Sequence, residues 1–137
     1  MKRLIITSTL IIATVAVYGQ AVKKDAFISM HTLTITLNPG ITMEEFREFY
    51  LNKVIPDYQR NIPEVRFYLV KAVRGEEEGR LAVLWVAESD KIRDKYHNAD
   101  GSRTEVAKEA RQKMQTVQDQ LNKMATITEK YTDWVVQ

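Results

Sequence analysis

Hydrophobic and polar residues alternate along residues 27–37, FISMHTLTITL. In an extended chain Leu33, Ile35 and Leu37 point to one side and the intervening threonines to the other, which is the period of a β-strand. The turn-forming Asn38-Pro39-Gly40 follows directly. The pattern therefore predicts a strand that ends at residue 37.

Two more strands are predicted on either side of a charged turn. Residues 64–74, EVRFYLVKAVR, alternate again, and residues 80–88, RLAVLWVAE, are mostly apolar with branched and aromatic side chains. The glycine-bounded GEEEG between them favours a hairpin loop. Consecutive glutamates splay apart in a turn and are usually solvated, so we do not expect a metal site there.

A first helix is predicted between the first two strands. Thr42 and Glu45 form a capping box, in which each side chain satisfies a backbone N–H at the helix start. Pro56 is expected to bend this helix or to end its first part. The residues that the helix buries are Phe46, Phe49, Tyr50 and Val54.

A second helical region follows the third strand. Ser89 can cap a short helix that runs to about Ala99. Ser102, with Glu105 three residues later, is a second capping box. It opens a long helix whose apolar residues recur at spacings of four and three, namely Val106, Ala110, Met114, Val117, Leu121 and Met124. The final KYTDWVV, residues 130–136, is expected to be a closing strand.

The segment YHNADGSR, residues 96–103, separates these helices and holds one of the two histidines. Asp100-Gly101 matches the centre of an EF-hand calcium loop, but the first and last ligand positions fall on Tyr96 and Ala107, which carry no carboxylate. A turn with a glycine at positive φ explains the segment better. Within one helix Tyr96 and His97 would diverge by about 100°, so we expect Tyr96 to point inward and His97 to be a surface or helix-end residue.

The predicted order is strand, helix, strand, strand, helix, strand. This is the α+β, ferredoxin-like βαββαβ arrangement, one antiparallel sheet with helices on a single face. Helices cover only one side of such a sheet, yet Tyr68, Val70 and Ala72, with Trp85 or its neighbours, leave neither side strongly polar. Because an exposed apolar face is a liability for a secreted monomer, we expect two sheets to pack face to face as a homodimer.

The first residues have the order of a signal peptide. Lys2 and Arg3 precede an apolar run over 4–17, which is short for a membrane span, and small residues follow at Val17 and Gly19. We therefore expect a signal peptide over 1–19, a single mature domain over 20–137 without a membrane span, and export to the periplasm or the medium. An uncleaved anchor and a buried strand are the alternatives.

Composition changes this picture in two ways. Without Lys2 and Arg3 the basic count falls from 20 to 18, which equals the acidic count of 18 because 1–19 contains no acid. A neutral domain lacks the clustered positive charge that binds nucleic acid, so no nucleic-acid partner is expected. The absence of cysteine excludes disulfides, a thiolate nucleophile and a cysteine-based zinc site.

The motifs of several enzyme classes are missing. The glycines punctuate turns, and there is no phosphate loop, dinucleotide fingerprint or G-x-S-x-G elbow. The acids lie mostly on predicted helix faces and turns, which gives paired-carboxylate chemistry little support. We expect a pocket without metal or cofactor, between the sheet and its helices or in the mouth of a barrel, that takes a small apolar or aromatic molecule.

Six residues are candidates for this pocket because they are polar or aromatic where plain core residues would suffice: His31, Arg66, Tyr68, Trp85, Tyr96 and Trp134. Histidine titrates near neutral pH, which suits proton transfer, but a lone histidine such as His31 is more often a core or strand-end residue bonded to backbone than a base. Arg66 and Tyr68 also fit a salt-bridged edge and a dimer interface, and the two tryptophans also fit core anchors.

Most of residues 20–137 resembles the dimeric α/β-barrel superfamily. Residues 43–70, MEEFREFYLNKVIPDYQRNIPEVRFYLV, are similar to the first helix and second strand of its EthD-like branch. Residues 81–100, LAVLWVAESDKIRDKYHNAD, are similar to its third strand and following short helix. The superfamily also contains antibiotic-biosynthesis monooxygenases and haem-degrading monooxygenases. The resemblance implies a ferredoxin-like chain that forms a dimeric α/β barrel.

The chain departs from this superfamily at its reactive positions. EthD-like proteins carry His-x-Pro at the end of the first helix, whereas Val54-Ile55-Pro56 keeps the proline and lacks the histidine. In haem-degrading relatives a Trp and an axial His occupy the positions of Tyr96 and Val106, so haem oxygenation is not expected. Two functions remain open: an exported homodimer that binds a small apolar or aromatic ligand without catalysis, and a cofactor-independent monooxygenase or related small-molecule enzyme.

Overall fold

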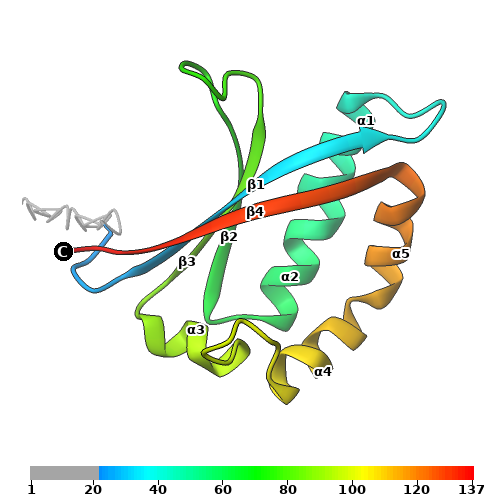
Figure 1. Ribbon diagram of the computed structural model, residues 1–137. Coiled ribbons are helices and arrows are strands. Elements are labelled where there is room, and N and C mark those ends of the chain that lie inside the picture. Colours follow the sequence, from blue (N-terminus) through cyan, green and yellow to red (C-terminus); the bar gives the residue numbers. More distant parts are fainter. Residues whose placement is uncertain (1–21) are drawn as a thin grey trace, which may run out of the picture.

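The computed structural model describes residues 22–137, which form one four-stranded antiparallel sheet with helices packed on one of its faces (Figure 1). The expected signal peptide lies outside the described residues. The strands are β1 (Phe27–Leu37), β2 (Val65–Lys71), β3 (Leu81–Ala87) and β4 (Ala125–Val135). They lie in the order β2-β3-β1-β4, and every neighbouring pair is antiparallel. This confirms the ferredoxin-like fold, because βαββαβ connectivity with both helical crossovers on one face produces this order.

The helices lie in two groups. The first is a continuous run of α1 (Met43–Phe49), a π-helical turn η1 (Tyr50–Val54) and α2 (Ile55–Asn61). The predicted capping box is present: Glu45 N–H donates to Thr42 Oγ1 at 3.2 Å, and Thr42 N–H donates to Glu45 Oε2 at 2.8 Å. Pro56 is the second residue of α2, which follows η1 directly, so the chain changes its helical pitch there and continues.

The second group is α3 (Asp90–Tyr96), α4 (Glu105–Lys113) and α5 (Gln115–Met124). The expected cap at Ser102 is wrong. Thr104 is the residue that caps α4, and its Oγ1 accepts a hydrogen bond from Ala107 N–H at 3.3 Å. The expected single long helix is divided at Met114.

The closing strand is longer than its sequence pattern predicted. β4 begins at Ala125 and pairs with β1 along the whole of that strand, from Phe27 opposite Val135 to Leu37 opposite Ala125. Residues 125–129 follow α5 without a turn signal, so the sequence did not separate the strand from the helix. The extension brings Glu129 beside β1, where it contributes to the candidate site described below.

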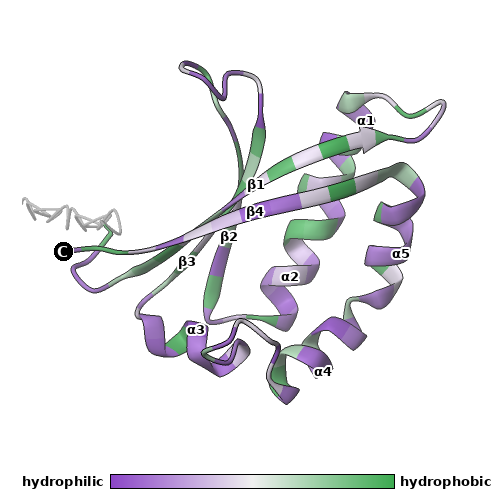
Figure 2. Ribbon diagram, in the orientation of Figure 1, coloured by the Kyte–Doolittle hydropathy of each residue, from purple (hydrophilic) through white to green (hydrophobic). Residues whose placement is uncertain are grey.

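The core lies between the sheet and the helices. Phe46 and Val54 are less than 2% exposed, and Leu33, Phe67 and Leu121 are at most 5% exposed. Figure 2 shows apolar residues alternating with polar ones along β1, as its sequence predicted. Within residues 22–137 no helix is long and apolar enough to cross a membrane.

The opposite face of the sheet has no helix over it (Figure 1). The strand register places Met30 beside Leu84, Tyr68 on the other side of Leu84, and Ile28 beside Trp134. Met30, Tyr68 and Trp134 are 42%, 47% and 59% exposed in the single chain. The expectation that neither side of the sheet is strongly polar therefore holds for these strands.

Candidate functional site

A cavity of about 300 Å³ lies between the helix-facing side of the sheet and the helices, and both helical groups contribute to its lining. Three of the six sequence candidates line it: His31, Trp85 and Tyr96. Arg66, Tyr68 and Trp134 lie on the open face instead, because side chains alternate along a strand and these residues are out of phase with the cavity. The structure thus divides the predicted set between two surfaces.

A row of polar side chains crosses β1 and β4 at the cavity. Register places Ser29 opposite Asp133, and Ser29 Oγ donates to Asp133 Oδ1 at 2.5 Å. His31 Nε2 lies 3.0 Å from Ser29 Oγ, and His31 Nδ1 lies 3.3 Å from Glu129 Oε2. Ser29 and His31 are 3% and 8% exposed, so this row is anchored in buried side chains and opens to solvent at its two acids.

The protons in this row can be counted. When the Ser29 hydroxyl donates to Asp133, its oxygen can only accept from His31 Nε2–H. His31 Nδ1 must then also carry a proton if it is to donate to Glu129. All three contacts are hydrogen bonds together only when His31 is an imidazolium or one carboxyl group holds a proton. One extra proton therefore completes the row.

The His31 ring is stacked between two aromatic rings. Its centroid is 4.6 Å from that of Trp85 at an interplanar angle of 15°, and 5.4 Å from that of Tyr131 at 22°. The Trp85 ring also contacts Phe67 edge-on at 5.1 Å. These ring contacts hold the imidazole in one orientation between β3 and β4.

His97 is a helix-end residue, as one of the two expected alternatives had it, but it is half-buried and also lines the cavity. α3 ends at Tyr96, and His97 has extended backbone with φ −135° and ψ 134°. The expected divergence from Tyr96 assumed a continuing helix, whereas the extended backbone lets both residues line the cavity. The His97 ring centroid is 6.3 Å from that of Trp85. Partial burial, followed by the nearby charge of Arg93, lowers the pKa of His97, so its neutral form is favoured.

Tyr96 is only 5% exposed, which agrees with its expected inward position. Its hydroxyl donates to Glu64 Oε2 at 2.7 Å, and Lys95 Nζ lies 2.7 Å from the same oxygen. Desolvation and this bond raise the pKa of Tyr96. The phenol therefore ties α3 to the start of β2, and its ring is the part that lines the cavity.

Two further tyrosines line the cavity from the first helical run. Burial is the main cause that raises the pKa of both Tyr50 and Tyr58, and the charge of Glu129 acts in the same direction. They are neutral phenols beside the cavity. The sequence treated Tyr50 as plain core and did not single out Tyr58.

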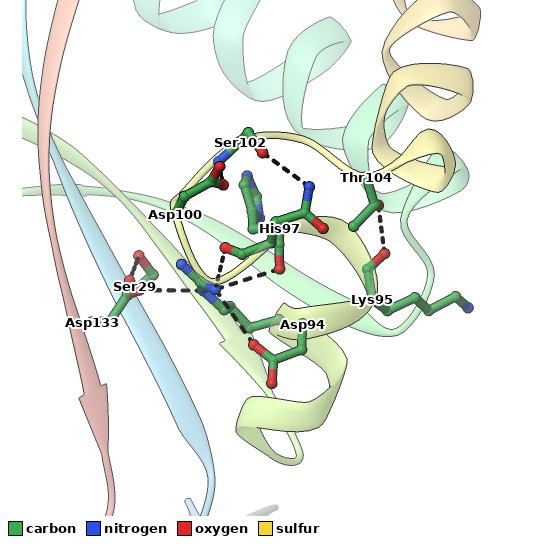
Figure 3. Close-up of polar contacts among 10 residues, drawn as sticks. Ser29, Asp94, Lys95, His97, Asp100, Ser102, Thr104 and Asp133 are labelled. Carbon is green, nitrogen blue, oxygen red and sulfur yellow. Dashed lines mark hydrogen bonds and ion pairs between the residues drawn. The ribbon is translucent and has the colours of Figure 1, made fainter.

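Residues 96–104 form one wall of the cavity as a closed corner (Figure 3). Ser102 N–H donates to Asp100 Oδ1 at 2.8 Å, and Gly101 has φ 81°, which confirms the predicted turn. Arg93 Nη1 lies 3.4 Å from His97 O, and its Nε lies 3.6 Å from Asp133 Oδ2 (Figure 3). Arg93 thus joins this corner to the polar row on β4.

Two other arginines line the same cavity and were not expected from the sequence. Arg103 pairs with His97 in an isolated antiparallel bridge, and Arg111 lies on α4. A signal was available, because Ala107, Arg111, Met114 and Gln118 recur at helical spacing and all line the cavity. These residues share Met114 with the apolar stripe of Val106, Ala110 and Met114 that predicted the helix.

Metal binding has no support in the described part of the chain. No group of three His, Asp or Glu side chains between residues 22 and 137 could hold a metal ion. Haem ligation was not expected either, and the position that would carry an axial histidine is Val106, which is 42% exposed on α4.

Comparison with known proteins gives only distant structural matches. No family model matches the chain, and no curated protein matches it. A dimeric protein of unknown function with a ferredoxin-like fold from Bacteroides fragilis has 11% identity and a TM-score of 0.39, over 79% of this chain and 95% of that one. A putative antibiotic biosynthesis monooxygenase from Bacteroides thetaiotaomicron has 17% identity and a TM-score of 0.38, over 81% and 89%.

A third match is a VAO-type flavoprotein from Myceliophthora thermophila, with 11% identity and a TM-score of 0.38, over 82% of this chain and 18% of that one. The assignment of a ferredoxin-like fold rests on the strand order and strand directions of this chain itself.

Proposed function

We propose that this protein binds a small planar aromatic molecule in the cavity between its sheet and its helices. The observation that carries the proposal is an accessible cavity whose wall combines aromatic rings with polar side chains, several of which are held in position by hydrogen bonds and ion pairs. Trp85 is half-buried at its floor, and its contacts with His31, Phe67 and Tyr58 hold the indole in one orientation. A volume of about 300 Å³ suits a ligand of two or three fused rings.

The proposal is tested with a matched pair of tryptophan variants. Trp85→Leu removes the floor of the cavity, whereas Trp134→Leu removes the tryptophan on the other face of the sheet. Titration calorimetry with 2-naphthol and with menadione is expected to show binding to the wild type and to Trp134→Leu, and at least tenfold weaker binding to Trp85→Leu. Binding that depends on Trp134 and not on Trp85 would place the site on the open face and contradict the proposal.

A second candidate function, cofactor-independent oxidation of a phenol, is favoured by one observation. Glu129 and His31 form a carboxylate–imidazole pair beside the cavity, and Glu129 is half-exposed to it. Such a pair could take the proton of a phenol and leave a phenolate for dioxygen to oxidise. However, the hydrogen bond from His31 lowers the pKa of Glu129, which makes it a weak base. Binding is therefore the function that the geometry supports better.

Oxygen consumption separates the two functions. With 2-naphthol or a reduced quinone, a binding protein consumes no oxygen above the rate without protein. If oxygen is consumed, Glu129→Gln should abolish turnover while calorimetry still shows binding. A Thr128→Ala variant, changed one residue away on the opposite face, is the matched control.

We further propose that a second copy of the chain covers the open face of the sheet, and that the protein acts after export. The support for the first is the apolar character of that face at Met30, Tyr68 and Trp134, and the support for the second is the sequence of residues 1–19. Light scattering at micromolar concentration should give twice the mass of the chain, and Tyr68→Lys should give the monomer. Mass spectrometry of protein recovered from the cell envelope or the medium should show the chain without its first 19 residues.

A further inference from the structure

The charges around the cavity do not balance. Three arginines line it, Arg93, Arg103 and Arg111, against two carboxylates, Glu129 and Asp133. Arg93 lies 3.6 Å from Asp133, and His31 lies 3.3 Å from Glu129. Both acids of the cavity wall therefore already have partners. Arg103 and Arg111 form no ion pair within 4.0 Å among residues 22–137.

Arg103 and Arg111 come from different elements, and both line the cavity. Arg103 follows the 96–102 corner and is held by its backbone bridge to His97. Arg111 lies one helical turn after Ala107 on the stripe of α4 that lines the cavity. Both also border the shallow polar hollow outside α4, so they stand at the rim between the cavity and solvent. Their position suits a group that enters from solvent.

Glu129 is the group that could neutralise them without a ligand. The charges of Arg103 and Arg111 both act to lower its pKa, so both guanidinium groups are near it. Neither approaches to contact distance, and the hydrogen bond from His31 is the largest of the effects on that carboxyl group. The charges of Arg103 and Arg111 therefore lower the pKa of Glu129, although neither arginine forms an ion pair with that carboxylate.

We propose that the ligand of this cavity is an aromatic carboxylate, whose ring lies along Trp85 and His97 and whose carboxylate is held by Arg103 and Arg111. The proposal rests on the proposed binding function. Guanidinium groups present N–H donors that match the two oxygens of a carboxylate, and hydrogen bonds between charged groups are stronger than neutral ones.

The test compares a charged ligand with a neutral one of the same shape. Titration calorimetry with 2-naphthoate and 2-naphthamide is expected to show tighter binding of the naphthoate, by roughly tenfold, at low salt. Arg103→Gln and Arg111→Gln should each remove most of that preference while naphthamide binding stays unchanged. Arg74→Gln, in the exposed hairpin between β2 and β3, is the control and should change neither.

The outcomes distinguish the two levels of the proposal. If both compounds bind equally, and Trp85→Leu weakens both, the cavity binds aromatics and the proposed charge preference is wrong. If neither compound binds, and 2-naphthol and menadione also fail, the binding function itself is wrong. Raised salt provides an independent readout, because the preference for naphthoate should shrink as the ions screen the two arginines. A preference that persists unchanged in Arg103→Gln/Arg111→Gln would overturn the assignment of these residues.

Discussion

The two faces of the sheet are built from the same strands and differ in how they use aromatic and charged residues. Phe67 and Tyr68 are neighbours on β2, yet Phe67 is 5% exposed beneath the helices and Tyr68 is 47% exposed on the open side. The helix side carries the buried polar row of Ser29 and His31, whose partners come from β4. On the open side, Tyr68 and Trp134 have no such polar partners among residues 22–137, and both rings are exposed in the single chain. The side under the helices thus holds the polar groups of the candidate site, and the open side holds exposed apolar and aromatic side chains.

The largest expected difference between the faces is in stability. Phe67→Ala removes a buried ring that contacts Tyr58 and Trp85, and should lower the free energy of unfolding by about 3–5 kcal/mol. Tyr68→Ala should cost below about 1 kcal/mol at a concentration where the chain is monomeric, because its ring is half-exposed. Urea denaturation at two protein concentrations measures both. A large, concentration-independent loss in Tyr68→Ala would mean that the open face is covered within one chain.

The next effect comes from the polar row. His31→Ala leaves Glu129 and Ser29 without their shared partner and empties the space between Trp85 and Tyr131. We expect a loss of about 1.5–3 kcal/mol in the free energy of unfolding, because the lost hydrogen bonds involve charged groups. Thr32→Ala, the next residue and on the other face, is the control and should cost much less. Equal losses in the two variants would show that the row contributes no stability.

A smaller effect is expected at Tyr96. Tyr96→Phe keeps the ring in the cavity wall and removes only the bond to Glu64, so it should cost about 0.5–1.5 kcal/mol in urea denaturation. Because the ring remains, binding of 2-naphthol to the variant should match the wild type. Binding that falls tenfold in Tyr96→Phe would show that the hydroxyl itself contacts the ligand.

The smallest effect is the pH dependence that Glu129 confers. The hydrogen bond from His31 lowers the pKa of Glu129 from its usual value of 4.5. The stabilising contact is therefore fully present above pH 4.5 and is lost as pH falls through the lower pKa of the folded protein. Solvent screening limits the contribution to about 1 kcal/mol or less. Thermal unfolding between pH 6 and pH 3 should show a shallower acid decline in Glu129→Gln than in the wild type, and identical slopes would contradict the assignment.

Much of the fold could be predicted from local patterns. The alternation in β1, the hairpin around GEEEG and the capping box at Thr42 and Glu45 are all decided by residues close in sequence. The prediction was wrong where two local signals competed. Ser102 and Thr104 both precede an acidic helix start, and only the packing of α3 against α4, with Thr104 Oγ1 bonded to Lys95 O at 2.7 Å, selects the second. The helix-to-strand change at Ala125 lacks a turn signal altogether.

The candidate site was predicted in part. His31 and Trp85 could be chosen because each is an unusual residue at a position in phase with core residues of its strand. Tyr96 could be chosen from helical phase. His97 could not, because its direction depends on the helix ending at Tyr96, about three residues before the end that the pattern predicted. Arg103 and Arg111 are ordinary surface arginines in the sequence and become notable only beside the cavity.

By itself, then, the sequence determined which segments are strands and helices, the order in which they follow, and which side of each strand is apolar, since these depend on neighbours within a few residues. Only the tertiary structure decided that Ser29 faces Asp133, that His31 meets Glu129 across 98 residues, and that two arginines stand at the rim without an acidic partner. Those relations depend on the register of β1 with β4 and on where α3 ends. Both are selected by the packing of the whole domain.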